Sequence, residues 1–227
     1  MGIGGHCIDY YHNLYDKGFF KKINNVIELG SQLVYIKNNE EDFFNFLIKI
    51  GISKPFDIIT GIVGDEINHL NYTIPAKYIY NFLGIDDYSS IDVDELFGAF
   101  GFDLNKDIKT CYSFNKQYDL VTNHGTTEHC FNQLSCFKNI HDLTKKNGYM
   151  IHSLPHHSNE HGLFDYTRHF FDCLINYNKY KAMYFKIYDA SKYSSIFITL
   201  KKRNDKDFIV PVDNVSINHI KKNTFKR

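Results

Sequence analysis

YDLVTNHGTTEH, residues 118–129, is the stretch of sequence that decides the fold. It opens with a short, mostly apolar run of residues that favour β-strands, YDLV. It then becomes a dense polar loop that holds His124, Glu128 and His129. Open α/β sheets build active sites where a buried strand releases a polar loop at its carboxyl end. The stretch therefore predicts a central strand with a functional loop, and a polar loop without chemistry is the alternative.

The composition gives no sign of a nucleic-acid or membrane partner. Lys plus Arg and Asp plus Glu number 26 each among 227 residues, so the formal net charge is zero. This balance argues against a polyanionic partner, and no apolar run approaches the ~20 residues of a membrane span. The five cysteines have no CxxC spacing and no signal peptide is evident. Both observations predict reduced thiols and a cytoplasmic location.

Strand and helix signals alternate along the rest of the chain. The expected strands end at acids or turn formers, and the expected helices carry apolar residues at helical spacing. The predicted strands cover 25–29, 88–91, 98–102, 118–122, 149–154, 180–188 and 194–200, and helices are predicted within 1–22, 39–50, 75–83, 131–145 and 165–176. The last two strands are expected to form an antiparallel pair. Residues 51–74 are predicted to be an irregular insertion in which 57–60 is strand-like.

This alternation indicates a doubly wound, Rossmann-like α/β fold. The expected sheet is mostly parallel and has an antiparallel edge strand. Residues 1–227 are assigned to a single domain with its core at about 24–200, because no Pro-rich or Ser/Gly-rich linker divides the chain.

Three strands of the first half end in an acid or a polar loop, and this order resembles a known family. The segments are VIELGSQ (26–32), SSID (89–92) and YDLVTNHGTTEH (118–129), followed by KNGYMIHSLPH (146–156). Together they resemble the class I S-adenosylmethionine-dependent methyltransferases, and the NHGTTEH loop is similar to a subgroup of bacterial and viral methyltransferase domains. The resemblance covers about residues 24–200. It implies a seven-stranded sheet in the order 3-2-1-4-5-7-6, with the last strand antiparallel and S-adenosylmethionine across the carboxyl ends of the first four strands.

The first motif departs from the family pattern. Glu28 and Gly30 match its acid and its first glycine, which the family uses to bind the cofactor. Gln32 and Val34 stand where the pattern acid-x-Gly-x-Gly-x-Gly has its other glycines. Glycines at such positions let the backbone approach a ligand closely. The departure implies either weaker cofactor binding or a contact from the Gln32 amide to the ligand.

The acids after the next two strands also have roles in the resemblance. Asp92 matches the acid that binds the ribose hydroxyls, and Asp103, with Leu104 beside it, matches the acid next to the adenine amino group. Asn123 and His124 match the loop near the reactive sulfonium. Asp is also a preferred residue at helix starts and turns, so each aspartate could serve only local structure. The order of the motifs favours ligand binding at Asp92 and leaves Asp103 open.

Histidines are the candidate general bases. Methyl transfer requires the protein to orient the acceptor and, for a hydroxyl, to remove a proton, and histidine titrates near neutral pH. His124 is the first candidate base, ahead of His161 and His129, because the loops that bear them are expected to face one cleft. His152 and His141 fall within a strand and a helix and are expected to be structural.

A metal site is the alternative interpretation of one histidine-rich segment. HSLPHHSNEHG (152–162) contains four histidines and Glu160, all suitable ligands. Its spacing matches no recognised metal motif, and no cysteine accompanies it. A loop that covers the acceptor is the preferred interpretation, and no metal is expected.

The leading functional hypothesis is a methyltransferase that acts on a small-molecule or sugar-like acceptor by O- or N-methylation. A binding or scaffold protein that kept the fold and lost turnover is the rival, and the departure at Gln32 and Val34 supports it. A nicotinamide-dependent oxidoreductase is a third option, but the three-glycine fingerprint of that class is missing at 30–35.

Overall fold

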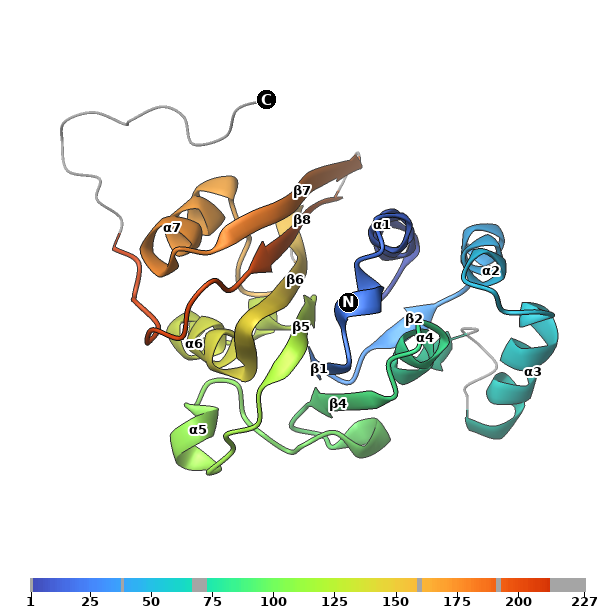
Figure 1. Ribbon diagram of the computed structural model, residues 1–227, viewed down its shortest axis with the longest axis horizontal. Helices are drawn as coiled ribbons and strands as arrows, with labels where there is room; N and C mark the ends of the chain where they lie inside the picture. The colour runs from blue at the N-terminus through green and yellow to red at the C-terminus, as the bar shows by residue number, and fades with distance from the viewer. Residues whose placement is uncertain (1, 38, 67–72, 159–160, 191–192, 213–227) are drawn as a thin grey trace.

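A central twisted sheet with helices on both sides forms the body of the computed structural model, which describes residues 2–37, 39–66, 73–158, 161–190 and 193–212 (Figure 1). The main sheet has six strands in the order β4-β1-β5-β6-β8-β7. A separate two-stranded sheet pairs β2 with β3.

The strands of the main sheet follow the buried and β-favouring runs of the sequence. In chain order they are β1 (Asn25–Leu29), β4 (Asp87–Ile91), β5 (Tyr118–His124), β6 (Thr144–Ser158), β7 (Lys181–Ala190) and β8 (Tyr193–Lys201). The neighbours among β1, β4, β5 and β6 pair in parallel, whereas β8 is antiparallel to both β6 and β7. β8 therefore lies one strand in from the edge, which β7 forms.

The observed strand order is the expected order without its third strand. The strand expected at 98–102 is reduced to a single parallel bridge between Ile91 and Phe100. Glu95 and Phe97 have left-handed backbones (φ 57° and 54°), so this segment turns instead of extending along β4. The expectation of seven strands is therefore wrong. The alternating α/β architecture and the antiparallel strand near one edge are confirmed.

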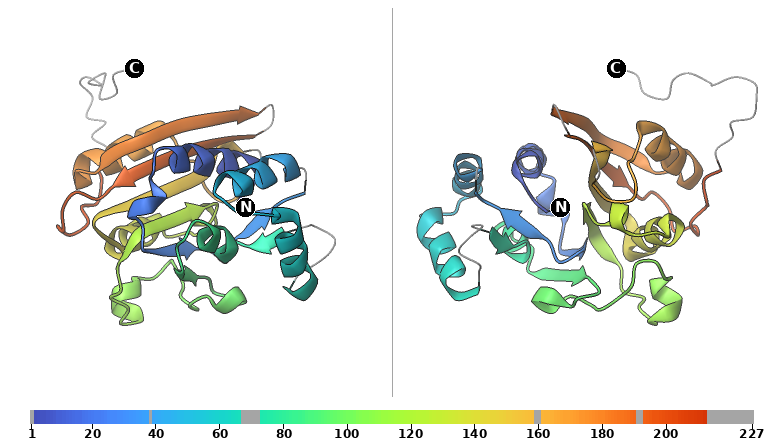
Figure 2. Two further views of the ribbon diagram at one scale, coloured as in Figure 1. Left: turned by 45° about the vertical axis from the view of Figure 1, so that its right-hand side comes forward. Right: turned by 180° about the vertical axis from the view of Figure 1, so that it is seen from behind.

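Helices cover both faces of the main sheet (Figure 2). One face is covered by α1 (Gly5–Asp16) and α4 (Lys77–Phe82), and the other by α5 (Ile108–Cys111), α6 (Gln133–Leu143) and α7 (Arg168–Asn178). α2 (Glu40–Lys49) and α3 (Pro55–Glu66) lie outside the first layer, where α2 contacts α1 and α3 contacts β3. Three short 3-10 turns, η1 (Phe20–Lys22), η2 (Leu96–Gly98) and η3 (Thr127–His129), connect these elements. Successive strand residues point to opposite faces, so Leu120 and Val121 pack into two different apolar cores. Among the described helices, none has both the length and the apolar character that crossing a bilayer demands.

Most helices match their predicted positions, and the region at 51–74 does not. The expected irregular insertion contains α3, and the strand-like residues 57–60 lie inside this helix. Pro55 is suited to a first helical turn because its missing N–H has no intrahelical partner there. The helix expected at 75–83 begins later, because Thr73–Pro75 forms β3.

The chain after the first strand is extended. β2 (Leu33–Tyr35) pairs antiparallel with β3, and Val34 also forms a parallel bridge with Ile3. In nucleotide-binding α/β folds, a helix N-terminus commonly follows this turn and faces the ligand. Here β1 is followed by a strand, so no helix dipole points at the ligand side of the sheet from this position.

Candidate functional site

A pocket of about 390 Å³ lies at the carboxyl ends of β1, β4 and β5. Five of the seven residues predicted to bind the cofactor line it, together with one predicted base: Gly30, Gln32, Asp92, Asp103, Leu104 and His129. Because β1 lies between β4 and β5 in a parallel sheet, the loops that follow these strands meet at one edge. The pocket is therefore built where the sequence analysis expected it.

The turn after β1 is closed by the side chain of Gln32. Gly30 has a left-handed backbone (φ 85°), and a Cβ there would lie 2.3 Å from Gln32 Nε2 and 2.5 Å from Thr126 Oγ1. Gln32 Nε2 donates to Leu29 O (3.2 Å) and to Thr126 Oγ1 (2.8 Å). The Gln32 amide nitrogen thus ties the first loop to the loop after β5, and a residue larger than glycine does not fit at position 30.

The two aspartates shape the loops and also line the pocket. Asp92 Oδ2 accepts a hydrogen bond from the backbone N–H of Ser31 (2.8 Å), which links the ends of β4 and β1. Asp103 Oδ1 accepts from the side chain and the backbone N–H of Asn105 (both 2.9 Å), and these bonds hold the pKa of Asp103 below its usual range. Asp103 therefore forms the turn considered in the sequence analysis, while it also lines the pocket wall.

Glu28 lies behind the pocket and does not line it. Its side chain is completely buried, and its two oxygens accept hydrogen bonds from Tyr80 Oη (3.1 Å) and Tyr88 Oη (2.8 Å). Burial raises the pKa of Glu28 to about 8, although both hydroxyls lower it in part. The side chain points toward α4, so the structure does not bring Glu28 to the position predicted for direct cofactor binding.

His124 and Asn123 point away from the pocket on opposite faces of β5. His124 Nε2 lies 2.8 Å from Tyr11 Oη, and its ring faces α1. Burial lowers the pKa of His124 to about 3, which keeps the ring neutral. Asn123 Nδ2 donates to Thr127 Oγ1 (2.9 Å), so Asn123 holds the following loop. The structure therefore does not bring His124, the first candidate base, to the pocket, because β5 continues through His124 and buries its ring.

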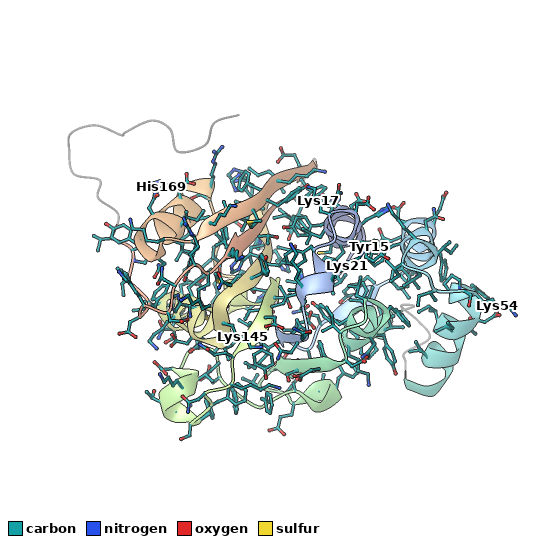
Figure 3. The ribbon with its side chains drawn as sticks, viewed as in Figure 1. Tyr15, Lys17, Lys21, Lys54, Lys145 and His169 are labelled. Atoms are coloured by element: carbon teal, nitrogen blue, oxygen red, sulfur yellow. The ribbon has the colours of Figure 1, made fainter. Side chains whose placement is uncertain are left out.

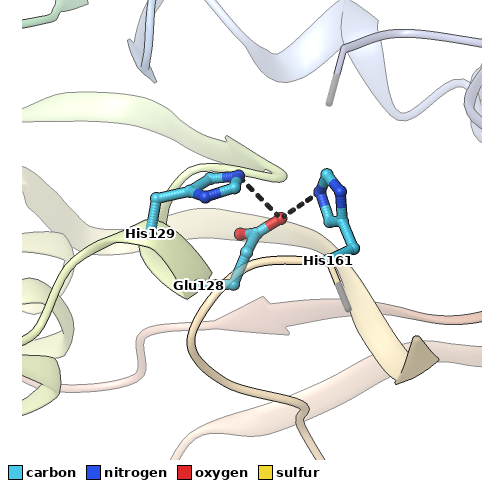
Figure 4. Close-up of side chains that lie close together, drawn as sticks. All are labelled: Glu128, His129 and His161. Carbon is cyan, nitrogen blue, oxygen red and sulfur yellow. Dashed lines mark ion pairs between the residues drawn. The ribbon is translucent and has the colours of Figure 1, made fainter. Parts of the chain in front are cut away.

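Glu128, His129 and His161 converge beside the pocket (Figure 4). Glu128 Oε1 lies 3.9 Å from His129 Nε2 and 3.7 Å from His161 Nε2. The Glu128 side chain is 0% exposed, and neither of its oxygens has a hydrogen-bond partner within the described ranges. Burial raises the pKa of Glu128 to about 7 and lowers the pKa of both histidines. His129 lines the pocket, so the cluster adjoins it.

Glu128 has no role in the family resemblance, although it belongs to the stretch 118–129 that forms β5 and its loop. The adjacent polar loop was the only signal, because His161 is distant in sequence and joins Glu128 only through the fold. Among the described residues of 152–162, the other candidate ligands do not join the cluster. His156 Nδ1 bonds with Tyr166 O (2.8 Å), and His157 is exposed. Glu160 lies outside the described residues.

A group of lysines lies at the other end of the sheet. Lys145, near the start of β6 (Figure 3), pairs with Asp119 (2.9 Å) beside a groove of about 480 Å³. Six lysines line this groove: Lys109, Lys116, Lys145, Lys146, Lys202 and Lys206. Among the described residues that line the pocket at the carboxyl ends, none is Lys or Arg.

Known proteins offer only distant likenesses to this chain. No family model matches the sequence, and no curated protein matches it either. Similar solved structures include 1,6-didemethyltoxoflavin-N1-methyltransferase from Burkholderia thailandensis, crystallised with S-adenosylhomocysteine (10% identity, 87% of this chain, 79% of that chain, TM-score 0.46). Magnesium protoporphyrin IX methyltransferase from Synechocystis PCC 6803 is another (9% identity, 88% of this chain, 79% of that chain, TM-score 0.47). A SAM-dependent methyltransferase from Archaeoglobus fulgidus is a third (12% identity, 86% of this chain, 94% of that chain, TM-score 0.48). The strand order described above is the firmer evidence for the fold.

Proposed function

We propose that this protein is an S-adenosylmethionine-dependent methyltransferase that acts on a small-molecule acceptor by O- or N-methylation. One observation carries the proposal. The residues that the resemblance assigns to cofactor binding come from three separate loops, and five of the seven line one pocket. The same pocket reaches a polar cluster of one glutamate and two histidines, which offers chemistry on the acceptor side.

The lining of the pocket suits this donor. Asp92 and Asp103 present carboxylate oxygens, which are acceptors for vicinal hydroxyls or for an exocyclic amine. Gly30 lines the pocket, and its missing side chain leaves room for Gln32 Nε2 and Thr126 Oγ1. The Gln32 side chain occupies space beside the first loop that a glycine would leave empty. Its hydrogen bond to Thr126 Oγ1 (2.8 Å) holds the side chain there.

The bound cofactor would supply the methyl group and a good leaving group. The chain then has to hold the acceptor in line and keep water away from the transfer. A hydroxyl acceptor must also lose its proton. Of the three predicted bases, His129 alone lines the pocket. The acceptor would therefore be deprotonated next to His129.

A binding protein without turnover is the second candidate, and the closure of the first loop by Gln32 favours it. Gln32 Nε2 is fully engaged by Leu29 O and Thr126 Oγ1, where the family pattern leaves open space. Transfer of a labelled methyl group to a mixture of small metabolites separates the two candidates. His129→Ala is expected to leave S-adenosylmethionine binding unchanged and to reduce any such transfer.

The decisive experiment measures cofactor affinity by calorimetry and thermal shift. S-adenosylmethionine and S-adenosylhomocysteine should bind and raise the melting temperature, and NAD should not. Asp92→Asn should weaken S-adenosylmethionine binding about 10-fold, which is about 1.4 kcal/mol, because the charged acceptor is lost. Asp86→Asn, an exposed aspartate just before the start of β4, is the control and should bind normally. Absence of binding to the unaltered protein, or full affinity in Asp92→Asn, would refute the proposed pocket.

A further inference from the structure

The loop that carries His161 is fixed directly onto Glu128. The backbone N–H of Leu163 donates to Glu128 O (2.7 Å). Gly162 has a left-handed backbone (φ 75°), and a Cβ there would lie 2.7 Å from Glu128 Cγ, so only glycine lets the two loops pass this closely. η3 places Glu128 and His129 next to each other on the other loop. The backbone hydrogen bond thus holds the two loops together, and Gly162 leaves the room that the Glu128 side chain needs between them.

The Glu128 carboxyl group is buried without the hydrogen bonds that usually accompany burial. Its side chain is 0% exposed, and both oxygens lack hydrogen-bond partners in the part of the chain that the structure describes. Burying a charged group costs several kcal/mol unless it is paired or binds a metal. The nearest polar atoms with measured separations are the two imidazole nitrogens, at 3.7 and 3.9 Å.

These separations fit two ligands of one ion better than they fit hydrogen bonds. A nitrogen–oxygen hydrogen bond is about 2.7–3.2 Å long. Two ligand atoms that each lie about 2.1 Å from a tetrahedral ion are about 3.4 Å apart, and wider angles separate them further. The candidate ligand atoms of all three residues fall within 4.8 Å of one another. The two rings are edge-to-face (5.1 Å, 81°), and both point a nitrogen at the same carboxylate oxygen (Figure 4).

We propose that Glu128, His129 and His161 bind one divalent transition-metal ion at the edge of the pocket. Two imidazoles and one carboxylate suit zinc, manganese, cobalt or ferrous iron, whereas magnesium and calcium prefer sites made mainly of oxygen. Three protein ligands leave at least one coordination position open. Because His129 also lines the pocket, the ion would lie at the pocket's edge.

The role of the ion rests on the proposed function, although the metal site itself does not. An acceptor hydroxyl at the open position is acidified by the cation. Its proton passes to solvent, and the oxygen electron pair forms the new bond to the methyl carbon while the carbon–sulfur bond breaks toward sulfur. This role selects acceptors with a hydroxyl group, and it assigns His129 to metal binding in place of proton abstraction.

The test measures metal binding to the full chain, without S-adenosylmethionine, after treatment with a chelator. Manganese, zinc and cobalt are titrated separately by equilibrium dialysis with metal analysis, and cobalt is also followed by its visible absorption. One ion per chain and a higher melting temperature are expected. Glu128→Gln and His161→Ala should each weaken binding at least about 100-fold. His157→Ala, an exposed histidine of the same segment, is the matched control and should bind normally.

The outcomes separate the metal site from the methyltransferase. The site is refuted if none of the three metals binds below millimolar concentration, or if both ligand variants bind as the unaltered protein does. Melting of the metal-free variants shows whether each one folds. Metal binding without S-adenosylmethionine binding would support the site and refute the proposed function. Equal methyl transfer by the chelated and the metal-loaded protein would refute the role of the ion in acceptor activation.

Discussion

Two glutamates are completely buried at neighbouring strand ends, and their surroundings differ. Glu28 belongs to β1, and Glu128 follows β5. Burial raises both pKa values, to about 8 and about 7. Glu28 accepts hydrogen bonds from two tyrosine hydroxyls, whereas Glu128 accepts none from the described residues. A buried acid with a shifted pKa is therefore no sufficient sign of a functional site, because the partners decide what the group can do.

The partners of Glu28 form a complete structural network. Tyr80 Oη also lies 2.9 Å from Tyr11 Oη and 3.2 Å from Thr122 Oγ1, and Tyr11 Oη lies 2.8 Å from His124 Nε2. These bonds join α1 and α4 to the central strands. The two imidazole nitrogens measured against Glu128 Oε1, at 3.7 and 3.9 Å, lie beyond hydrogen-bonding distance. Glu28 is therefore assigned to stability, and Glu128 to the site.

Removal of the Glu28 or the Glu128 side chain should give the largest difference in stability between the two sites. Glu28→Ala and Glu128→Ala both leave a cavity, but only the first leaves tyrosine hydroxyls without their acceptor. Glu28→Ala is expected to lower the free energy of unfolding of the metal-free protein by about 3 kcal/mol more than Glu128→Ala does. Urea denaturation of both variants measures the difference. Equal losses would show that the tyrosine hydrogen bonds do not distinguish the two glutamates.

The second-largest effect should be a pH dependence of stability caused by Glu28. Its folded-state pKa, about 8, is above the ordinary value of 4.5, so its contribution is complete below pH 4.5 and is lost as pH rises through 8. Relative to Glu28→Gln, the unaltered protein should lose about 3 kcal/mol between pH 5 and pH 7.5. The pKa of His124 is lowered, so its burial destabilises the folded protein as pH falls from 6.5 toward 3. This effect is the same in both proteins and cancels in the comparison. Urea denaturation of both proteins at each pH measures the difference in the free energy of unfolding. A difference that stays constant from pH 5 to pH 7.5 would contradict the raised pKa of Glu28.

The smallest effect should come from one tyrosine hydroxyl. Tyr88→Phe removes the 2.8 Å hydrogen bond to Glu28 and keeps the ring that stacks on Tyr80. A loss of about 1–2 kcal/mol in the free energy of unfolding is expected. Tyr15→Phe, at a half-buried position of α1, serves as the control and should change stability by less than about 0.5 kcal/mol. Thermal and urea unfolding of the two variants would reveal whether the Tyr88 hydroxyl stabilises Glu28.

The sequence predicted the parts of the molecule that local patterns determine. Gly30, Asp92 and Asp103 follow strand signals, and all three line the pocket. His124 lies outside the pocket for a local reason. β5 runs two residues beyond its predicted end at 122, and the alternation of side chains along the strand points His124 into the core. Local patterns could not pair Glu128 with His161, because contacts between two distant loops create that pair.

The charge of the pocket has a consequence for the proposed methyl transfer. Asp92 and Asp103 line it, and no Lys or Arg stands among its described lining residues. A sulfonium donor carries one positive charge more than the thioether that remains after transfer. The two carboxylates would therefore attract the donor more strongly than the spent cofactor, so the reaction itself would loosen its by-product and favour exchange for a fresh donor.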